Sequence, residues 1–578
     1  MSDPTLPARR ARFLVRVAAP ALLGASFGLS ASAQTATAPR GLPDAGSILQ
    51  QLQPDTSPAP SATIELPELG ARRAAPAPVR GGPAFEVKGF HLAGVTDTEA
   101  AELLPLLDAR VGTGRTLGDL EEAARDLEAT LQRRGLFLAQ VCVPAQTLAG
   151  GIVTLQVYEG RLGELTLDVA PDVRVSTAFL ERVVAPLRRH PLLERGLVER
   201  VLLTLGDLRA IAVTSSLEPG KEIGEADLTI HVRALKGDAI DMDFDNAGST
   251  FTGRPRYYVN PDWFNLAGRG DVASVRTQFS NGSQFFRASW MTPVDGDGDK
   301  VGISSSYLVY HLGTPLFYPL HADGDASTWG VMALHPAIRS RNQNLFVQAS
   351  LETRYFEDRV RAIDIDDKKG VTVYANLGLT GDFRDTAGGG GISNWSAQFV
   401  LGHLSLDTPS EATLDAQTYR SAGNYAKVVL SAARLQSLPN RDYLYLSAQA
   451  QLASKNLDSS EKFNVGGLYG LRAYPSPESP SDEALLWTWE YRKPIAPGAL
   501  PGDFVFSVFG DYGVMRQHVT PQPGEAGNVR KLMGHGIGLT RTDDAGLTLR
   551  VTAALRGRTS AESDDQHLRI LFQASKQF

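Results

Sequence analysis

Apolar and polar positions alternate along more than half of the chain, from Ala239 to the last residue, in segments of roughly ten residues separated by Gly, Pro, Asn and Asp. Residues 485–492 show the pattern, with Leu485, Trp487, Trp489 and Tyr491 on one side and Leu486, Thr488, Glu490 and Arg492 on the other. Side chains of a β-strand point alternately to opposite faces, so each segment predicts a strand with one apolar face. A soluble antiparallel sheet with one wet face would give the same pattern in any single segment.

The number of these segments favours a membrane barrel. Sixteen candidates begin near residues 239, 256, 270, 284, 300, 327, 344, 370, 392, 421, 442, 484, 503, 531, 545 and 566. Bacterial outer-membrane barrels have an even number of antiparallel strands, and about 21 residues per strand and connector leave room for a spanning strand of about 9 to 11 residues. The sequence therefore predicts an antiparallel 16-stranded transmembrane β-barrel over residues 236–578.

The connectors between the predicted strands are of two kinds. Residues 265–268, 295–299 and 542–544 are short connectors, whereas 312–326, 408–419 and 453–482 are long. In such barrels the periplasmic turns are short and the external loops are longer. We therefore expect the long connectors, of which 453–482 is the longest, on the cell surface.

Two α+β segments precede the predicted barrel. The first, residues 85–161, contains a strand at 85–90, a helix at 98–107, a second helix with Thr116 and Asp119 as a capping box and Gly135 as C-cap, and strands at 137–143 and 151–158. The second, residues 162–235, repeats the order with a strand at 162–169, helices at 176–187 and 193–205, and strands at 211–217 and 227–232. The shared β-α-α-β-β order predicts two copies of one module. A single α+β domain over both segments is the alternative.

The N-terminal residues 1–33 have the features of a secretory signal peptide: arginines, then an apolar stretch from Val17 to Leu29, then Ala31-Ser32-Ala33. Residues 34–53 contain a short helical candidate with Ser47 placed to cap it, and the apolar side chains Ile48, Leu49 and Leu52 share one side. A helix this short is marginal in water, so it must dock on another part of the protein. Residues 54–84 are rich in proline, which predicts an extended linker.

Composition and motifs exclude several classes of function. The chain has 57 Lys+Arg and 64 Asp+Glu, a net charge of −7. This charge argues against electrostatic binding of nucleic acid by a generally basic surface. The single cysteine, Cys142, cannot form an intramolecular disulfide or supply a thiolate metal site alone, and we expect it to be a small buried hydrophobic residue in a strand. The sequence contains no Walker motif, Gly-x-Ser-x-Gly or His-Glu-x-x-His. We expect no enzymatic activity, no cofactor, no bound metal and no transport driven by nucleotide hydrolysis.

The longest connector contains an apolar, glycine-rich segment whose arginine has a possible carboxylate partner in the barrel. Residues 466–474, GGLYGLRAY, are too apolar for a freely solvated loop tip, so we expect them to fold back onto the protein. In the strand that begins near residue 503, Phe509, Asp511 and Gly513 face the lumen. Asp511 has no cation two residues away on either side, and Arg472 is its obvious partner if the loop enters the barrel. An exposed arginine and a solvated carboxylate are the alternative.

These residues resemble a known family. Leu471-Arg472-Ala473-Tyr474 resembles the Val-Arg-Gly-Tyr/Phe motif in the sixth extracellular loop of two-partner secretion transporters (TpsB), and residues 509–513, FGDYG, resemble their Phe-x-Asp-x-Gly strand motif. These are the haemolysin- and haemagglutinin-exporting members of the BamA-like superfamily. Residues 144–160 are similar to the end of a first POTRA module, and residues 245–253 to the opening strand of the barrel. The resemblance covers essentially the whole mature chain.

The resemblance implies a set of functional residues. The two motifs would lock together inside the barrel, which assigns this role to Leu471, Arg472, Tyr474, Phe509, Asp511 and Gly513. The helix that carries Ile48, Leu49 and Leu52 matches the position of a pore-plugging helix. Leu471 and Ala473 depart from the family's Val and Gly, which leaves the local backbone of the loop open.

The function implied is export of a large exoprotein. A pore in the outer membrane of a Gram-negative bacterium would carry a cognate haemolysin- or adhesin-like protein from periplasm to cell surface without nucleotide hydrolysis. Its partners would be the exoprotein, through an N-terminal secretion domain that binds unspecified POTRA residues, together with periplasmic chaperones, the barrel-assembly machinery and outer-membrane lipid, with no nucleic acid. The alternatives are an insertase of the BamA-like type, which usually has more POTRA modules, and a solute-conducting porin or receptor, which lacks them.

Overall fold

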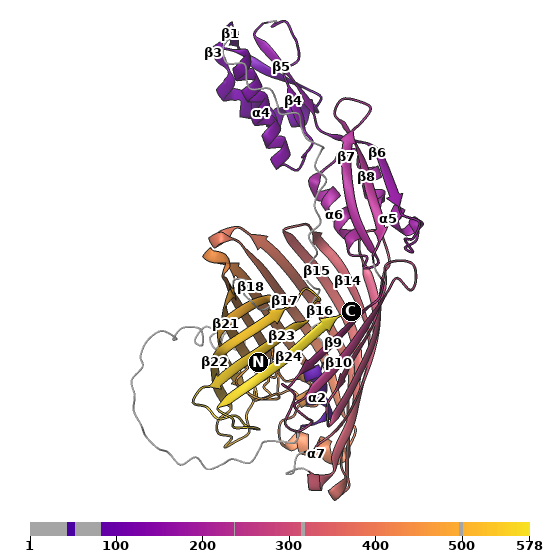
Figure 1. Ribbon diagram of the computed structural model, residues 1–578, viewed down its shortest axis with the longest axis vertical. Coiled ribbons are helices and arrows are strands. Elements are labelled where there is room, and N and C mark those ends of the chain that lie inside the picture. The colour runs from indigo at the N-terminus through magenta and orange to yellow at the C-terminus, as the bar shows by residue number, and fades with distance from the viewer. Residues whose placement is uncertain (1–42, 53–82, 149, 236, 314–317, 496–500) are drawn as a thin grey trace, which may run out of the picture.

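The computed structural model describes residues 43–52, 83–148, 150–235, 237–313, 318–495 and 501–578. Figure 1 shows two small α+β modules that extend, one after the other, from one end of a large β-barrel. Helix α2 (Ala45–Leu52) packs against the barrel wall from the inside. The predicted signal peptide, residues 1–33, and most of the predicted linker lie outside the described residues. Among the described helices, none is both long and apolar enough to cross a membrane.

The first module is a three-stranded sheet packed against helices. Its elements are β1 (Phe85–Val87), β2 (Gly89–Ala93), α3 (Asp97–Leu103), the 3-10 helix η1 (Leu104–Arg110), β3 (Gly112–Arg115), α4 (Leu117–Arg133), β4 (Gln140–Cys142) and β5 (Ile152–Tyr158). Helix α4 begins at the capping box of Thr116 and Asp119, and Gly135 follows its end with a φ of +107°, as predicted. The sheet has the order β2-β5-β4, with β2 parallel and β4 antiparallel to β5. The pair β1–β3 was not predicted.

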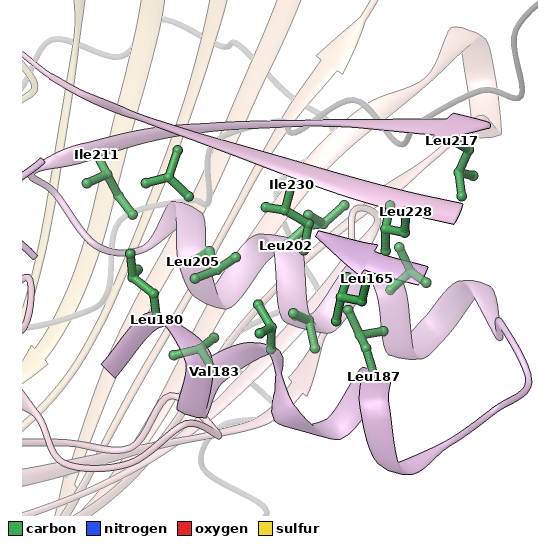
Figure 2. Close-up of a cluster of buried hydrophobic side chains, with 14 of the residues drawn as sticks. Leu165, Leu180, Val183, Leu187, Leu202, Leu205, Ile211, Leu217, Leu228 and Ile230 are labelled. Carbon is green, nitrogen blue, oxygen red and sulfur yellow. The ribbon is translucent and has the colours of Figure 1, made fainter. Parts of the chain in front are cut away.

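The second module repeats this topology. Its elements are β6 (Arg161–Val169), α5 (Thr177–Arg189), α6 (Arg195–Gly206), β7 (Ile211–Pro219) and β8 (Glu225–Ala234). The sheet has the order β6-β8-β7, and β6 is parallel and β7 antiparallel to the central β8, which confirms the predicted repeat. Figure 2 shows its core, in which Leu180 and Val183 of α5 and Leu205 of α6 pack beneath Ile230 of the sheet.

The prediction that Cys142 is buried was wrong. The thiol lies in β4 as expected, but β4 is a three-residue strand at the edge of its sheet, and only Val141 faces the core. Cys142 points to the other side and is exposed. The burial that remains raises the pKa of the thiol, so it is neutral at neutral pH.

The two modules and the barrel contact one another closely. Leu138 of the first module packs in the core of the second, and the backbone N–H of Arg195 donates to the carbonyl of Gly135 at 2.9 Å. At the other end of the second module, the guanidinium of Arg339, at the end of barrel strand β14 (Ala322–Arg339), binds both carboxylate oxygens of Asp207 at 3.0 and 2.6 Å. These contacts join the modules to the turns at one end of the barrel.

The barrel is closed and entirely antiparallel, as predicted. Its sixteen strands, all within the described residues, are β9 (Ala239–Asp245), β10 (Arg256–Phe264), β11 (Val272–Phe279), β12 (Ser283–Pro293), β13 (Lys300–His311), β14, β15 (Gln343–Val360), β16 (Ile365–Asp385), β17 (Gly391–Leu406), β18 (Gly423–Ser437), β19 (Tyr443–Ala453), β20 (Glu483–Ile495), β21 (Asp503–Arg516), β22 (Val529–Thr542), β23 (Thr548–Arg556) and β24 (Leu568–Gln577). Strand β24 pairs with β9 to close the ring.

The two faces of the barrel differ as the alternation predicts. Large apolar side chains lie on the outside, where Trp329 is 61% exposed and Leu377 58%. Many lumen-facing positions are polar, and Ser306 and Thr328 share a buried hydrogen bond of 2.7 Å. Apolar lumen-facing side chains such as Leu308 and Phe356 pack around helix α2. The three predicted short connectors lie at the module end, and the predicted long connectors, including the one that carries α7 (Pro409–Gln417), start from the opposite end. The connectors at 280–282 and 361–364, also at that opposite end, are short.

Candidate functional site

The long connector between β19 and β20, residues 454–482, folds back into the lumen. Its descending arm, residues 454–465, and its ascending arm, residues 471–482, pair where Phe463 and Ser481 exchange backbone hydrogen bonds of 2.7 and 3.0 Å. Val465, Leu471 and Tyr474 are almost completely buried against side chains of β21 and β22. This burial accounts for the apolar composition of the loop.

Glycines permit the tight turn at the tip of this loop. A Cβ atom at Gly466 would lie 1.7 Å from the carbonyl oxygen of Pro475, and one at Gly470 would lie 2.2 Å from that of Val465. Gly467 has a φ of +96°, which L side chains rarely adopt. The two arms can therefore approach each other only with glycine at these positions.

Arg472 and Asp511 are brought together inside the barrel. The carboxylate of Asp511 accepts hydrogen bonds from the backbone N–H of Arg472 at 3.1 Å, from its Nε at 3.0 Å and from its Nη2 at 2.8 Å. Both residues are at least 95% buried. Thr488 of β20 donates a further hydrogen bond to the same carboxylate at 3.0 Å. The forked geometry is the one in which an arginine binds a carboxylate most strongly.

Arg472 has two more partners in the wall. Its Nη1 donates to Glu490 of β20, and its guanidinium carbon lies 3.4 Å from the ring centre of Phe509. Sequence reasoning placed Glu490 on the lumen face but did not recognise it as a partner of Arg472. The signal was available in the pairing of β20 with β21, which sets Glu490 opposite Phe509, two residues from Asp511.

The other residues of the two motifs surround this ion pair. A Cβ atom at Gly513 would lie 2.9 Å from Leu471 Cδ1, so glycine makes room for the loop. The hydroxyl of Tyr474 donates to the carbonyl of Thr559 at 2.9 Å. Ala473 is absent from the residues with positive φ and packs on Gly534, where a Cβ would lie 2.5 Å from its own Cβ. The departure from the family's glycine at this position therefore requires no unusual backbone.

Helix α2 occupies the lumen beside the loop. Ile48 and Leu49 are buried against barrel side chains, and Leu52 is partly buried there. The predicted N-cap position was wrong: Asp44 caps the helix by accepting from the backbone N–H of Ser47 at 2.9 Å, and the hydroxyl of Ser47 accepts in return from the backbone N–H of Asp44 at 3.1 Å. The reason is that the helix begins at Ala45, which places Ser47 in its first turn.

Asp44 also fixes the helix to its surroundings. Its carboxylate accepts from Lys369 Nζ of β16 at 2.6 Å and from the hydroxyl of Ser459 in the descending arm. A Cβ at Gly46 would lie 2.6 Å from that of Ser460, so the helix and the arm are in close contact. The sequence pointed to neither Asp44 nor Lys369, because they lie far apart along the chain in unrelated patterns.

Comparison with known proteins identifies the family. Residues 85–160 match the ShlB-type POTRA domain, and residues 224–541, more than half the chain, match the haemolysin secretion/activation protein family ShlB/FhaC/HecB. The chain belongs to the ShlB/FhaC/HecB family. This family consists of secretion transporters of the two-partner type and is not a family of enzymes. The barrel therefore lies in the outer membrane, with the POTRA modules in the periplasm.

Individual relatives resemble this ShlB/FhaC/HecB protein over most of their length. It is 26% identical over 535 residues to the heme/hemopexin transporter protein HuxB of Haemophilus influenzae strain Rd, which covers 91% of this chain and 93% of that protein. It is 20% identical over 471 residues to the outer membrane transporter CdiB of Dickeya dadantii, covering 79% and 80%. The solved structure of CdiB from Escherichia coli shares the fold, with a TM-score of 0.70, 19% identity, and coverage of 90% and 94%.

Proposed function

We propose that this chain exports one large cognate exoprotein, of haemolysin- or adhesin-like type, from the periplasm to the cell surface without nucleotide hydrolysis. The observation that carries the proposal is that a loop and a helix of the chain itself occupy the lumen. A folded-in loop and a helix fill part of a closed barrel, and both are held by polar contacts that can be exchanged for water. Such contents can move aside without breaking any strand pairing of the wall.

The POTRA modules would receive the exoprotein. Each module has a three-stranded sheet, and within the described residues its two outer strands have no further strand of the sheet on one side. An extended N-terminal secretion domain can add a strand to such an edge. Periplasmic chaperones would keep the exoprotein unfolded before it binds, and the barrel-assembly machinery would insert the transporter itself. Folding outside the cell would give export its direction.

We propose a role for the motif residues as well. Arg472, Asp511, Phe509, Leu471, Tyr474 and Gly513 would keep the loop docked, and Ile48, Leu49 and Leu52 would keep α2 as the plug of the resting pore. The loop and helix contacts support this assignment, because they bury charge and apolar surface at the same time.

Disruption of the gene tests the proposal. We expect one large protein that is normally exported to accumulate in the periplasm, and expression of the intact gene should return it to the surface. General loss of barrel proteins from the outer membrane would instead indicate an insertase. A defect confined to uptake of small solutes would indicate a porin or receptor.

A further inference from the structure

A second buried ion cluster anchors the descending arm to strands of the wall other than those that bind Arg472. Glu461 is completely buried, and its carboxylate binds Arg354 Nη1 of β15 at 2.7 Å and Lys427 Nζ of β18 at 2.9 Å. Lys427 also donates to the backbone carbonyl of Glu461 at 2.8 Å, and Gln451 of β19 donates to the same carbonyl at 3.1 Å. None of the motif residues takes part in this cluster.

The arm that Glu461 anchors binds both ends of helix α2, while the wall holds the start of the helix through Asp358, which accepts from the backbone N–H of Ala45 at 2.8 Å. Lys369 binds Asp44 of the helix and Asp458 of the arm, the latter at 3.1 Å. At the other end of the helix, Asn464 Nδ2 donates to Gln50 Oε1 at 2.9 Å. Within the described residues, the ascending arm offers the helix one hydrogen bond, from Ser476 to Gln51 at 3.1 Å.

We infer that Glu461 is a positioning residue that keeps α2 in the lumen by anchoring the descending arm. This anchor acts independently of the Arg472–Asp511 ion pair. Glu461 makes no hydrogen bond or ion pair with the helix, so it acts through the arm. The inference rests on the proposed function only in taking α2 for the plug.

The charges explain why the arm depends on this residue. Within the described residues, Arg354 retains Glu352 as a second carboxylate partner, but Lys427 has its only ion pair with Glu461. If Glu461 becomes neutral, the 7%-exposed Lys427 is left as a buried charge without a counter-charge. A buried charge in this state is strongly unfavourable, and movement of the arm away from the wall lets water reach it.

Thiol labelling of the helix tests the inference. Ile48→Cys is introduced together with Cys142→Ser, so that the only thiol lies on the buried side of α2, and the purified full-length protein is treated with a charged maleimide. We expect Glu461→Gln to speed labelling at residue 48 about tenfold or more, because the arm that covers the helix opens to hydrate the unpaired cation. No exoprotein is present, so this result does not depend on whether the gene disruption traps an exoprotein.

The matched control is Glu490→Gln. It removes another buried lumen carboxylate, which binds Arg472 and makes no hydrogen bond or ion pair with the descending arm, and labelling should stay near the parent rate. The double variant Glu461→Gln with Lys427→Gln removes one charge of each sign and should label more slowly than Glu461→Gln alone. Heat-modifiable migration in gels establishes that each barrel is folded. Unchanged labelling in Glu461→Gln, equal acceleration in Glu490→Gln, or no rescue in the double variant would overturn the inference.

Discussion

Replacement of Asp511 by alanine removes the carboxylate that holds the ascending arm. Arg472 loses three hydrogen bonds, of 2.8 to 3.1 Å, and keeps Glu490 and the ring of Phe509. Breaking a buried pair by removal of one partner costs roughly 3–5 kcal/mol, and because Glu490 remains we expect about 3 kcal/mol. That corresponds to roughly a 150-fold shift from the docked toward the undocked loop.

The assay for this variant is export of the exoprotein, measured by immunoblot of the cell surface, medium and periplasm. We expect the exoprotein to remain in the periplasm with Asp511→Ala and with Arg472→Ala, while heat-modifiable migration shows that each barrel is folded in the outer membrane. The control is Thr488→Val, which removes one neutral donor to the same carboxylate and should cost only about 1.5 kcal/mol, because the three donors of Arg472 remain, with export nearly normal. Normal export by both charge variants would refute the idea that docking of this loop matters to transport.

Further expectations concern the modules, the loop and the free thiol. Deletion of residues 85–234 should abolish binding of the exoprotein to the purified transporter in a pull-down, and undiminished binding to the bare barrel would argue against POTRA recognition. Gly513→Val should place methyl groups where Leu471 now packs, and should therefore impair export as strongly as Asp511→Ala; wild-type export would contradict the tight fit. Cys142 should react with maleimide in the folded protein, faster as the pH rises toward its raised pKa, whereas resistance to labelling until denaturation would contradict its exposure.

The barrel was predictable because every strand repeats the same alternation of apolar and polar positions. Each barrel strand has one face toward lipid and one toward the lumen, so the same two-residue period recurs sixteen times and errors at single segments do not change the result. The modules were predictable for a similar reason, since α4 carries a capping box, an apolar stripe and a terminal glycine in sequence order. Cys142 shows the limit: a three-residue edge strand is too short for its pattern to reveal which side is buried.

The ion pairs of the lumen were predictable only in part. Arg472 and Asp511 were paired from their spacing and from the resemblance to a family. Glu490 lies on the neighbouring strand β20, and the spacing of charges along β21 does not show which residues that strand places beside Asp511. Glu461 and Lys369 bind partners contributed by other strands and by the N-terminal helix, and no local pattern in the sequence records such contacts.

The rim of the barrel on the cell surface is uneven. Strand β16 has 21 residues and β9 has 7, which at about 3.4 Å per residue correspond to about 70 and 24 Å. The long strands β14 to β17 stand together, whereas the short strands β9, β23 and β24 lie across the ring from them (Figure 1). A polypeptide that leaves the lumen is therefore screened on one flank and open to water on the other, so we expect its first folded turns to form over the low side of the rim.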